Sequence, residues 1–213
     1  MTSGREDYLK ALYYLGEKGE MVSNKALAEA LGVSQPSVSE MLVKLQRDGS
    51  IDYTAYKGSR LTQKGRQEAL QLMRFHRLWE VFLTECLGYS WSDAHEEAHL
   101  LEHDTSEKLA ARLDEYLHHP THCPHGSLIP GEDGTYHPSP LRPLIQLKEG
   151  ESTFIRKVVE ERELMDYLQE LGIRIGMRVT LQKAGKYEGS LTLSAEGGDI
   201  VLSYKAACQI YVD

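Results

Sequence analysis

The chain has 213 residues and a formal net charge of −8 at pH 7, so it is long enough for two or three small domains and is not basic overall. It contains no run of about 18 apolar residues and does not begin like a secretory signal, so we expect a cytoplasmic protein without a membrane segment. The three cysteines, Cys86, Cys123 and Cys208, are far apart and form no C-x-x-C pair. This excludes a disulfide framework and a four-thiolate zinc site as the organising feature.

The acidic residues are unevenly distributed. Residues 1–72 contain 10 Lys and Arg against 9 Asp and Glu, a balance of +1, whereas residues 73–213 contain 14 against 23, a balance of −9. Charge alone is therefore no evidence for a nucleic-acid partner, although a nearly neutral segment can still present a basic face. Such evidence has to come from the pattern of residues.

The first 50 residues predict three helices. Apolar residues at helical spacing indicate the first over residues 5–16. A second helix is capped by Ser23 or Asn24, and a third runs from the cap Ser34 to Gly49. A short helix, a tight glycine-containing turn and a longer helix are typical of a helix-turn-helix.

A β-favouring stretch follows the third helix. The run IDYTAY from residue 51, a turn at 57–59 and RLT up to residue 62 predict a two-stranded hairpin, which after a helix-turn-helix is a wing. Short polar side chains let a helix approach base edges, and basic groups suit phosphate oxygens. We therefore expect double-stranded DNA as the partner; a small domain that docks another protein is the alternative. The expected DNA contacts are Ser34, Gln35, Pro36, Ser37, Ser39, Lys44, Lys57 and Arg60.

The rest of the chain divides into a helical part and a β-rich part. Helices over 65–87 and 92–118 form a hairpin with an apolar surface for a core or a dimer interface. The Pro-, Gly- and His-rich segment 118–140 is a loop or linker. Strands at 153–159, 178–183, 190–194 and 200–203, with a helix at 161–171, predict a small β-barrel. The fold class is thus mainly α with small β parts: a winged helix-turn-helix over 1–72, a helical dimerisation and metal-binding domain with linker over 73–143, and a small β-barrel over 144–213.

The segment HEEAHLLEH at residues 95–103 carries the candidate chemistry. On a helix, His99 and His103 are four residues apart with Glu102 on nearly the same side, so three donors can converge on one ion. His95 lies roughly 12 Å along the axis from His103. The spacing therefore permits two metal sites, or one site and a structural histidine.

Two further donor pairs lie outside this segment. His76 and Glu80 form an i, i+4 pair on the preceding helix, which an antiparallel hairpin can bring against the histidine row. Cys123 and His125 place a thiolate and an imidazole two residues apart on a loop. Such pairs also occur by chance on solvated surfaces, but together these donors suit manganese, ferrous iron, cobalt or zinc.

Several motifs together resemble a known family. EDYLKALYYLGE, SQPSVSEML, RLTQKG, HRLWEVFL and HEEAHLLEH, in this order, are similar to the diphtheria toxin repressor and manganese transport regulator family, in its long form with a C-terminal FeoA-like domain. The resemblance covers essentially the whole chain. It implies a homodimeric transcriptional repressor of metal-uptake genes that binds palindromic operators when loaded with Mn²⁺ or Fe²⁺, with Zn²⁺, Co²⁺ or Cd²⁺ as surrogates.

The resemblance also implies two metal sites. One links the first helix to the helical hairpin through Asp7, His76, His99, Glu102 and His103. The second ties the hairpin to the barrel through Glu80, Cys123, His125 and Glu160, and His95 and Glu163 match positions that some members use.

Three positions depart from the family pattern. Lys10 stands where many relatives have a Glu or Met ligand, and a protonated lysine has no lone pair to donate. His99 stands where manganese-selective members often have Glu and iron-selective ones Cys or Met, so it does not decide the metal. Glu160 replaces Asp, which preserves a carboxylate but changes its reach.

The resemblance suggests how metal acts, and two other function classes remain open. The hypothesis is that metal pins the first helix to the dimerisation hairpin through Asp7 and selects the arrangement of winged domains that fits the operator. A metal-dependent hydrolase using His99, Glu102 and His103 lacks the H-E-x-x-H arrangement. A metal-independent winged-helix regulator is the other alternative. Because the hydrolase arrangement is missing, we expect a regulator and not an enzyme.

Overall fold

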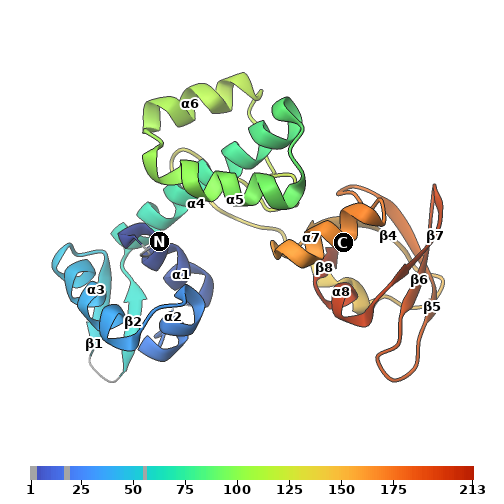
Figure 1. Cartoon of the computed structure of the whole chain (residues 1–213), viewed down its shortest axis with the longest axis horizontal. Coiled ribbons are helices and arrows are strands. Elements are labelled where there is room, and N and C mark those ends of the chain that lie inside the picture. The colour runs from blue at the N-terminus through green and yellow to red at the C-terminus, as the bar shows by residue number, and fades with distance from the viewer. Residues whose placement is uncertain (1–3, 17–19, 55–56) are drawn as a thin grey trace. The chain divides into compact units, whose positions relative to one another are not determined.

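The computed structural model describes residues 4–16, 20–54 and 57–213 (Figure 1). The chain forms two compact units. The first comprises residues up to 75 together with 102–104 and 130–136, and the second comprises residues 76–101, 105–129 and 137–213. In the described ranges no helix is both long and apolar enough to cross a bilayer. The three-domain division made from the sequence stays a prediction.

The first unit begins with the expected helix-turn-helix and wing. Ser23 caps the second helix through a 3.1 Å bond from the Ala26 amide, and Gly32 ends it with φ +64°. Gly58 and Ser59 lie in the second strand of the antiparallel hairpin, where Gly58 pairs with Thr54, so the turn predicted at 57–59 was placed too late. The predicted run IDYTAY ends on residues 55–56, which lie outside the described ranges. The elements are α1 (Arg5–Leu15), α2 (Asn24–Leu31), α3 (Gln35–Arg47), β1 (Ile51–Thr54) and β2 (Gly58–Leu61).

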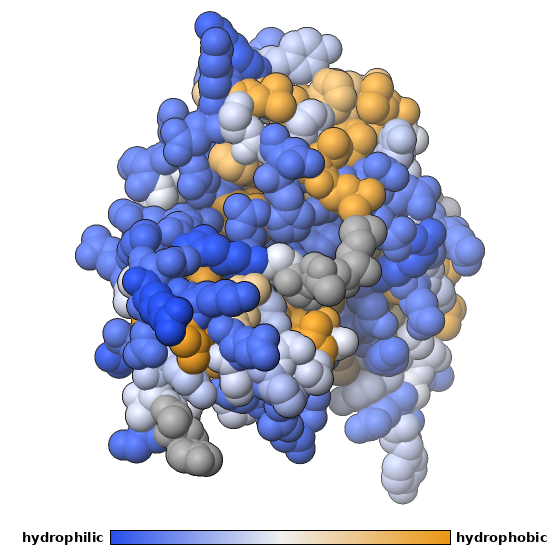
Figure 2. Space-filling view, turned by 60° about the vertical axis from the view of Figure 1, so that its left-hand side comes forward, coloured by the Kyte–Doolittle hydropathy of each residue, from blue (hydrophilic) through white to orange (hydrophobic). Residues whose placement is uncertain are grey.

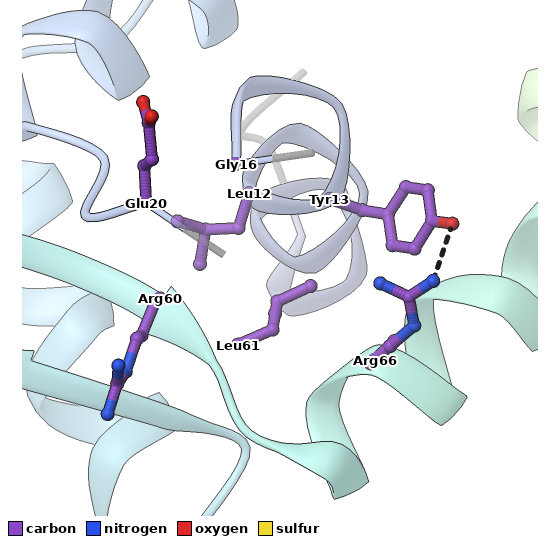
Figure 3. Close-up of a pocket in the computed structure, with 7 residues that line it drawn as sticks. All are labelled: Leu12, Tyr13, Gly16, Glu20, Arg60, Leu61 and Arg66. Carbon is purple, nitrogen blue, oxygen red and sulfur yellow. Dashed lines mark hydrogen bonds between the residues drawn. The ribbon is translucent and has the colours of Figure 1, made fainter. Parts of the chain in front are cut away.

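The core of this unit fixes α1 against the hairpin and the start of α4 (Gln63–Leu87). Leu9, Leu12 and Leu42 are fully buried in it. At the edge of a shallow hollow, Figure 3 shows Arg66 of α4 beside Tyr13 of α1, with a 3.4 Å hydrogen bond from the guanidinium to the phenol oxygen. The guanidinium carbon also lies 5.0 Å from the centre of the Tyr13 ring. The first turn of α4 is thereby tied to α1.

The helix predicted over residues 92–118 is broken in the structure. The chain forms α5 (Trp91–Leu101), a 3₁₀ turn η1 (Glu102–Asp104) and α6 (Glu107–Tyr116). Thr105 is extended, and its hydroxyl donates to the Leu101 carbonyl while accepting a 2.7 Å bond from the Trp79 indole. Ser106 then caps α6. The prediction of one helix was wrong because these local bonds offer the backbone a competing arrangement.

The C-terminal part of the second unit is a six-stranded antiparallel sheet that curves into a barrel (Figure 1). Its strand order is β3-β8-β4-β5-β6-β7, and alternate residues of β4, such as Thr153 and Ile155, face the core. The predicted barrel is confirmed. The elements are β3 (Arg142–Pro143), η2 (Leu144–Gln146), β4 (Ser152–Val158), α7 (Arg162–Glu170), β5 (Arg178–Ala184), β6 (Leu191–Ala195), β7 (Gly198–Leu202), α8 (Tyr204–Cys208) and β8 (Ile210–Val212).

Within the second unit, α5 packs on α7 of the barrel. The Trp91 amide donates to the Gln169 side chain at 2.9 Å, and Ser92 donates to Asp166 at 2.5 Å. Arg162 forms ion pairs with Asp93 and Glu96 on the exposed edge of the contact. Trp91 itself is buried in the barrel core, so this contact brings the helical residues of the unit against the barrel.

Candidate metal centre

A buried carboxylate, Glu80, is the focus of a cluster of donor side chains in the second unit. Its Oε1 lies 2.9 Å from His76 Nε2, 2.8 Å from His95 Nδ1 and 3.2 Å from His125 Nδ1. The side chains of Glu80 and His125 are fully buried and that of His76 is 3% exposed. Glu80 Oε2 is also buried, and it makes no hydrogen bond within the described part of the chain.

Local structure explains why these groups meet. His76 and Glu80 are one turn apart on α4, so their side chains lie on the same face. His95 lies on α5, and its ring is 4.8 Å from that of His76. His76 and Glu80 therefore meet His95, the first residue of the histidine row, as the predicted antiparallel hairpin implies.

A tight turn supplies the thiol and the third imidazole. Cys123 and Ser127 close it through a 2.9 Å amide–carbonyl bond, and the His125 carbonyl accepts from the Val158 amide of β4 at 3.0 Å. Gly126 between them has φ +83°, and a Cβ there would lie 1.8 Å from the Arg156 carbonyl oxygen. Only glycine lets this turn lie against β4.

The orientation of the His125 ring leaves one nitrogen for a ligand. Nε2 lies 3.3 Å from the Trp91 carbonyl, to which it donates, while Nδ1 faces Glu80 and lies 3.8 Å from Cys123 Sγ. A backbone acceptor on one ring nitrogen is the usual device that holds the other as a metal ligand.

Glu160 brings a carboxylate from the barrel. It lies two residues after the end of β4, and its Oε1 accepts a 2.9 Å bond from the Ser127 hydroxyl. One donor atom each from Glu80, Cys123, His125 and Glu160 lies within 4.8 Å of all the others, and the same holds for His76, Glu80 and His95. These two groups share Glu80 and form one cluster of six donors.

Burial and charge shape the protonation of the cluster. Burial raises the pKa of Glu80, but the charges of His76 and His125 and their hydrogen bonds outweigh it and hold that pKa well below its usual range. Burial, followed by the charges of Glu80 and Glu160, raises the pKa of the Cys123 thiol well above its ordinary value. Burial lowers the pKa of His125, but the Glu80 carboxylate raises it more. Glu80 is thus held as an anion beside a thiol and an imidazole whose pKa values are raised.

These residues fit a divalent cation of borderline softness. Ligands about 2.0 to 2.3 Å from a common ion lie within about 4.6 Å of one another, which agrees with the spacing of the cluster. A buried oxygen without a hydrogen bond, as at Glu80, is costly unless a cation or a water satisfies it. Carboxylate, imidazole and thiolate donors together suit Mn²⁺, Fe²⁺ or Zn²⁺ better than Ca²⁺ or Mg²⁺.

The group next to α1 fits a metal less well. In the first unit, Asp7 Oδ1 lies 3.2 Å from His103 Nε2, without hydrogen-bond geometry, and Glu102 Oε1 lies 3.7 Å from the same nitrogen. Both Glu102 oxygens, however, accept hydrogen bonds from the Lys10 ammonium, at 2.9 and 2.8 Å. The carboxylate that would bind an ion here already binds a cation.

One of the other expected ligands, His76, has partners that differ from the assignment implied by the resemblance. His76 lies with Glu80 and His95 in the second unit, because its face of α4 meets α5; its assignment to the site of Asp7 stays a prediction. His99 is exposed at the end of α5, in the second unit. Glu163 is exposed on α7 and belongs to none of the donor groups formed by the described residues.

Three further residues support the cluster and were not predicted from the sequence. Ser127 orients Glu160, the Trp91 carbonyl orients His125, and buried Arg77 donates to the Leu128 carbonyl just after the turn. The glycine within CPHGS was a usable signal for a tight turn beside the ligands. The contacts of Trp91 with His125 and of Arg77 with Leu128 join elements that are distant in sequence, so no local pattern predicts them.

The predicted DNA-contact residues lie at the start of α3 and on the wing. Ser39 is half-buried because its hydroxyl donates to the Gln35 carbonyl at 3.1 Å and accepts from the Asn24 amide at 3.0 Å. Arg60 forms a 3.1 Å ion pair with Asp52 across the hairpin. The exposed members of the set are Ser34, Gln35, Pro36, Ser37, Lys44, Lys57 and Arg60.

Three family models match successive parts of the chain. Residues 1–59 match the iron dependent repressor N-terminal DNA binding domain, residues 62–131 the iron dependent repressor metal binding and dimerisation domain, and residues 142–213 the FeoA domain. Together they confirm the fold class and the resemblance indicated by the motifs.

Characterised proteins similar to this chain are repressors. The iron-dependent repressor IdeR of Mycobacterium tuberculosis is 31% identical over 223 residues, which covers 98% of this chain and 96% of IdeR. The diphtheria toxin repressor of Corynebacterium diphtheriae is 31% identical over 208 residues, which covers 92% and 91%.

Solved structures agree with these relatives. A manganese-dependent transcriptional repressor in complex with manganese superimposes with a TM-score of 0.87 at 34% identity, over 98% of this chain and 99% of that one. The structure of ScaR with bound Zn²⁺ gives 0.81 at 34% identity, over 99% of each chain. The chain belongs to the iron-dependent repressor family, whose members are metal-dependent DNA-binding transcriptional repressors and not enzymes.

Proposed function

We propose that this chain is a cytoplasmic, homodimeric repressor that binds palindromic operator DNA of metal-uptake genes when Mn²⁺ or Fe²⁺ fills its buried donor cluster. The observation that carries the proposal is the convergence of three imidazole nitrogens on Glu80 Oε1, with a thiol and a second carboxylate beside them. Relatives activated by iron or manganese, and a similar structure that holds manganese, support the choice of ion.

Glu80, Cys123, His125 and Glu160 would hold the ion. These four residues come from α4, from the Cys123–Ser127 turn and from the end of β4. His76 and His95 share Glu80 and complete the surroundings. Ligation at this cluster would fasten the turn and the barrel edge to α4, and it would favour whichever conformation of the protein brings the donors together.

The helical region supplies the surface for a second copy. Residues 62–131 match a metal binding and dimerisation domain. Figure 2 shows apolar side chains gathered over this region, and the exposed large apolar residues there include Leu87, Leu100 and Leu109, which are 56%, 48% and 45% exposed. A contiguous apolar area on a soluble domain marks an interaction site, and a twofold dimer explains the expected palindrome of the operator.

The test compares wild type with a double variant, Glu80→Gln and Cys123→Ser, which keeps the shape of the cluster and removes two ligands. The DNA used is a palindromic duplex, selected from a randomised pool with the Mn²⁺-loaded wild-type protein. Binding is measured by fluorescence anisotropy, first with a chelator and then with Mn²⁺. Wild type should bind only with Mn²⁺. The double variant should not bind in either condition, because the ion no longer stabilises the binding conformation.

Glu97→Gln is the matched control, since Glu97 is an exposed carboxylate on α5 outside the donor groups. It should behave as wild type. Equal affinity of wild type in chelator and in Mn²⁺ would instead support the metal-independent regulator, and Mn²⁺-dependent binding by the double variant would remove the buried cluster from activation.

A further inference from the structure

Lys10 occupies the position of a cation in the group beside α1. Its ammonium lies 2.9 Å from one oxygen of Glu102 and 2.8 Å from the other. The Glu102 side chain is completely buried and that of Lys10 is only 15% exposed. Because both side chains are largely out of water, the contact between Lys10 and Glu102 is a structural ion pair and not a solvated surface contact.

The neighbouring donors are also engaged. His103 Nδ1 lies 2.6 Å from Glu6 Oε2, and Asp7 Oδ2 accepts a 2.8 Å bond from the Gly4 amide at the start of α1. Asp7 and Lys10 are three residues apart on α1, so both face the η1 turn. The three acidic side chains that meet here are thus engaged by an ammonium, an imidazole and a backbone amide.

A divalent ion can bind Glu102 only if the ammonium leaves. A protonated lysine has three donors and no lone pair, so it cannot join the ion as a ligand. The displaced ammonium would also remain close to a second positive charge in a partly buried place, where such repulsion is weakly screened. Binding of an ion therefore carries a cost at this group that is absent at the buried cluster.

We propose that the Lys10 ammonium is the built-in cation of this group, which keeps Asp7, Glu102 and His103 from taking up Mn²⁺ and joins α1 to the η1 turn without metal. The inference deepens the proposed function, on which it rests, because it leaves the buried cluster as the metal-responsive site of the chain.

The first experiment counts Mn²⁺ bound per subunit by equilibrium dialysis of the full-length protein, without DNA. Glu102→Gln keeps an oxygen for Lys10 but removes the anionic ligand, and it should bind the same number of ions as wild type. Loss of one ion per subunit on this change would overturn the proposal.

The second experiment frees the group in the Glu80→Gln, Cys123→Ser background. Adding Lys10→Met, which keeps the apolar stem and removes the ammonium, should add one Mn²⁺ per subunit and make the thermal midpoint rise when Mn²⁺ is added. Lys10→Arg retains the positive charge and should add none. A gain with arginine as large as with methionine would refute the role of the charge.

The outcomes separate this inference from the proposed function. Circular dichroism checks that each variant is folded, and if Lys10→Met does not fold, the Glu102→Gln count still decides. Ion counts do not depend on operator binding, so a chain that fails to bind DNA can still confirm or refute the role of Lys10.

Discussion

At the scale of single residues, the environment of Glu80 Oε1 sets the chemistry. Three imidazole nitrogens lie within 3.2 Å of this one oxygen, so without metal the imidazoles are its hydrogen-bond partners. A cation in the same place satisfies the carboxylate and the lone pairs of the rings together. Metal and protons therefore compete for the same donors.

Metal affinity should rise with pH across the neutral range. The Cys123 thiol, whose pKa is raised first by burial, is protonated in the free protein and must lose its proton on ligation, and His125, whose pKa is also raised, must do the same. A group protonated when free and deprotonated when bound favours binding at higher pH until the pH exceeds its free pKa. Calorimetry of Mn²⁺ binding in two buffers of different ionisation enthalpy should show proton release, and Cys123→Ser should release about one proton fewer. Equal heats in both buffers would contradict this account.

The members of the donor cluster were partly predictable from the sequence. Donor types at helical or two-residue spacing, as in His76 with Glu80 and Cys123 with His125, identified members of the cluster. The spacing of His76 and Glu80 agrees with their place beside His95, whereas the assignment of His76 to the site of Asp7 came from the family resemblance alone. The Lys10 ion pair was hidden, since Glu102 is 92 residues away along the chain.

At the scale of elements, the Cys123–Ser127 turn depends on Gly126. Its φ of +83° disfavours a side chain, and a Cβ would also overlap the Arg156 carbonyl of β4. The two effects can be separated, because Gly134 has a similar φ of +80° and no atom within 4 Å of its Cβ position.

Gly126→Ala should cost at least about 2 kcal/mol of unfolding free energy and weaken Mn²⁺ binding, since backbone strain alone costs about 1 to 3 kcal/mol and the clash adds to it. Urea denaturation and metal titration measure the two effects. Gly134→Ala should show the strain cost alone and leave Mn²⁺ affinity unchanged. Equal losses in the two variants would show that the approach to β4 is unimportant.

The elements differ in how well the sequence predicted them. The three N-terminal helices, the wing and the main barrel strands were found because caps, glycines and apolar periodicity all agree there. The break between α5 and α6 was missed because residues 92–118 are periodic throughout, while Thr105 takes its partner from Trp79 on another helix. Short β3, β8 and α8 have too few residues to show a period.

At the scale of the whole molecule, the net charge of −8 and DNA binding are compatible. Residues 1–72 hold a balance of +1, and Lys44, Lys57 and Arg60 are exposed there. Arg60 is paired with Asp52, so the two lysines are the better candidates for phosphate contacts. The acidic residues 73–213 repel DNA, so we expect DNA to bind only at the winged domain.

Lys57→Ala should weaken operator binding and flatten its salt dependence. Each lost phosphate contact lowers the slope of log affinity against log salt by about 0.9, and a dimer loses one contact from each protomer. Anisotropy titrations over a series of salt concentrations measure the slope. Lys205→Ala, an exposed lysine of α8 in the barrel, is the control and should leave the slope as in wild type; an equal drop in both would assign the effect to overall charge.

The depth at which Cys123 lies has a consequence for oxidative stress. Thiolates react with peroxides far faster than thiols, and burial keeps this sulfur in the thiol form while the cluster is empty. Cys86, which is exposed, meets a diffusing oxidant first. The Cys123 thiol is therefore expected to stay reduced while no metal is bound, and to remain available as the proposed ligand when metal returns.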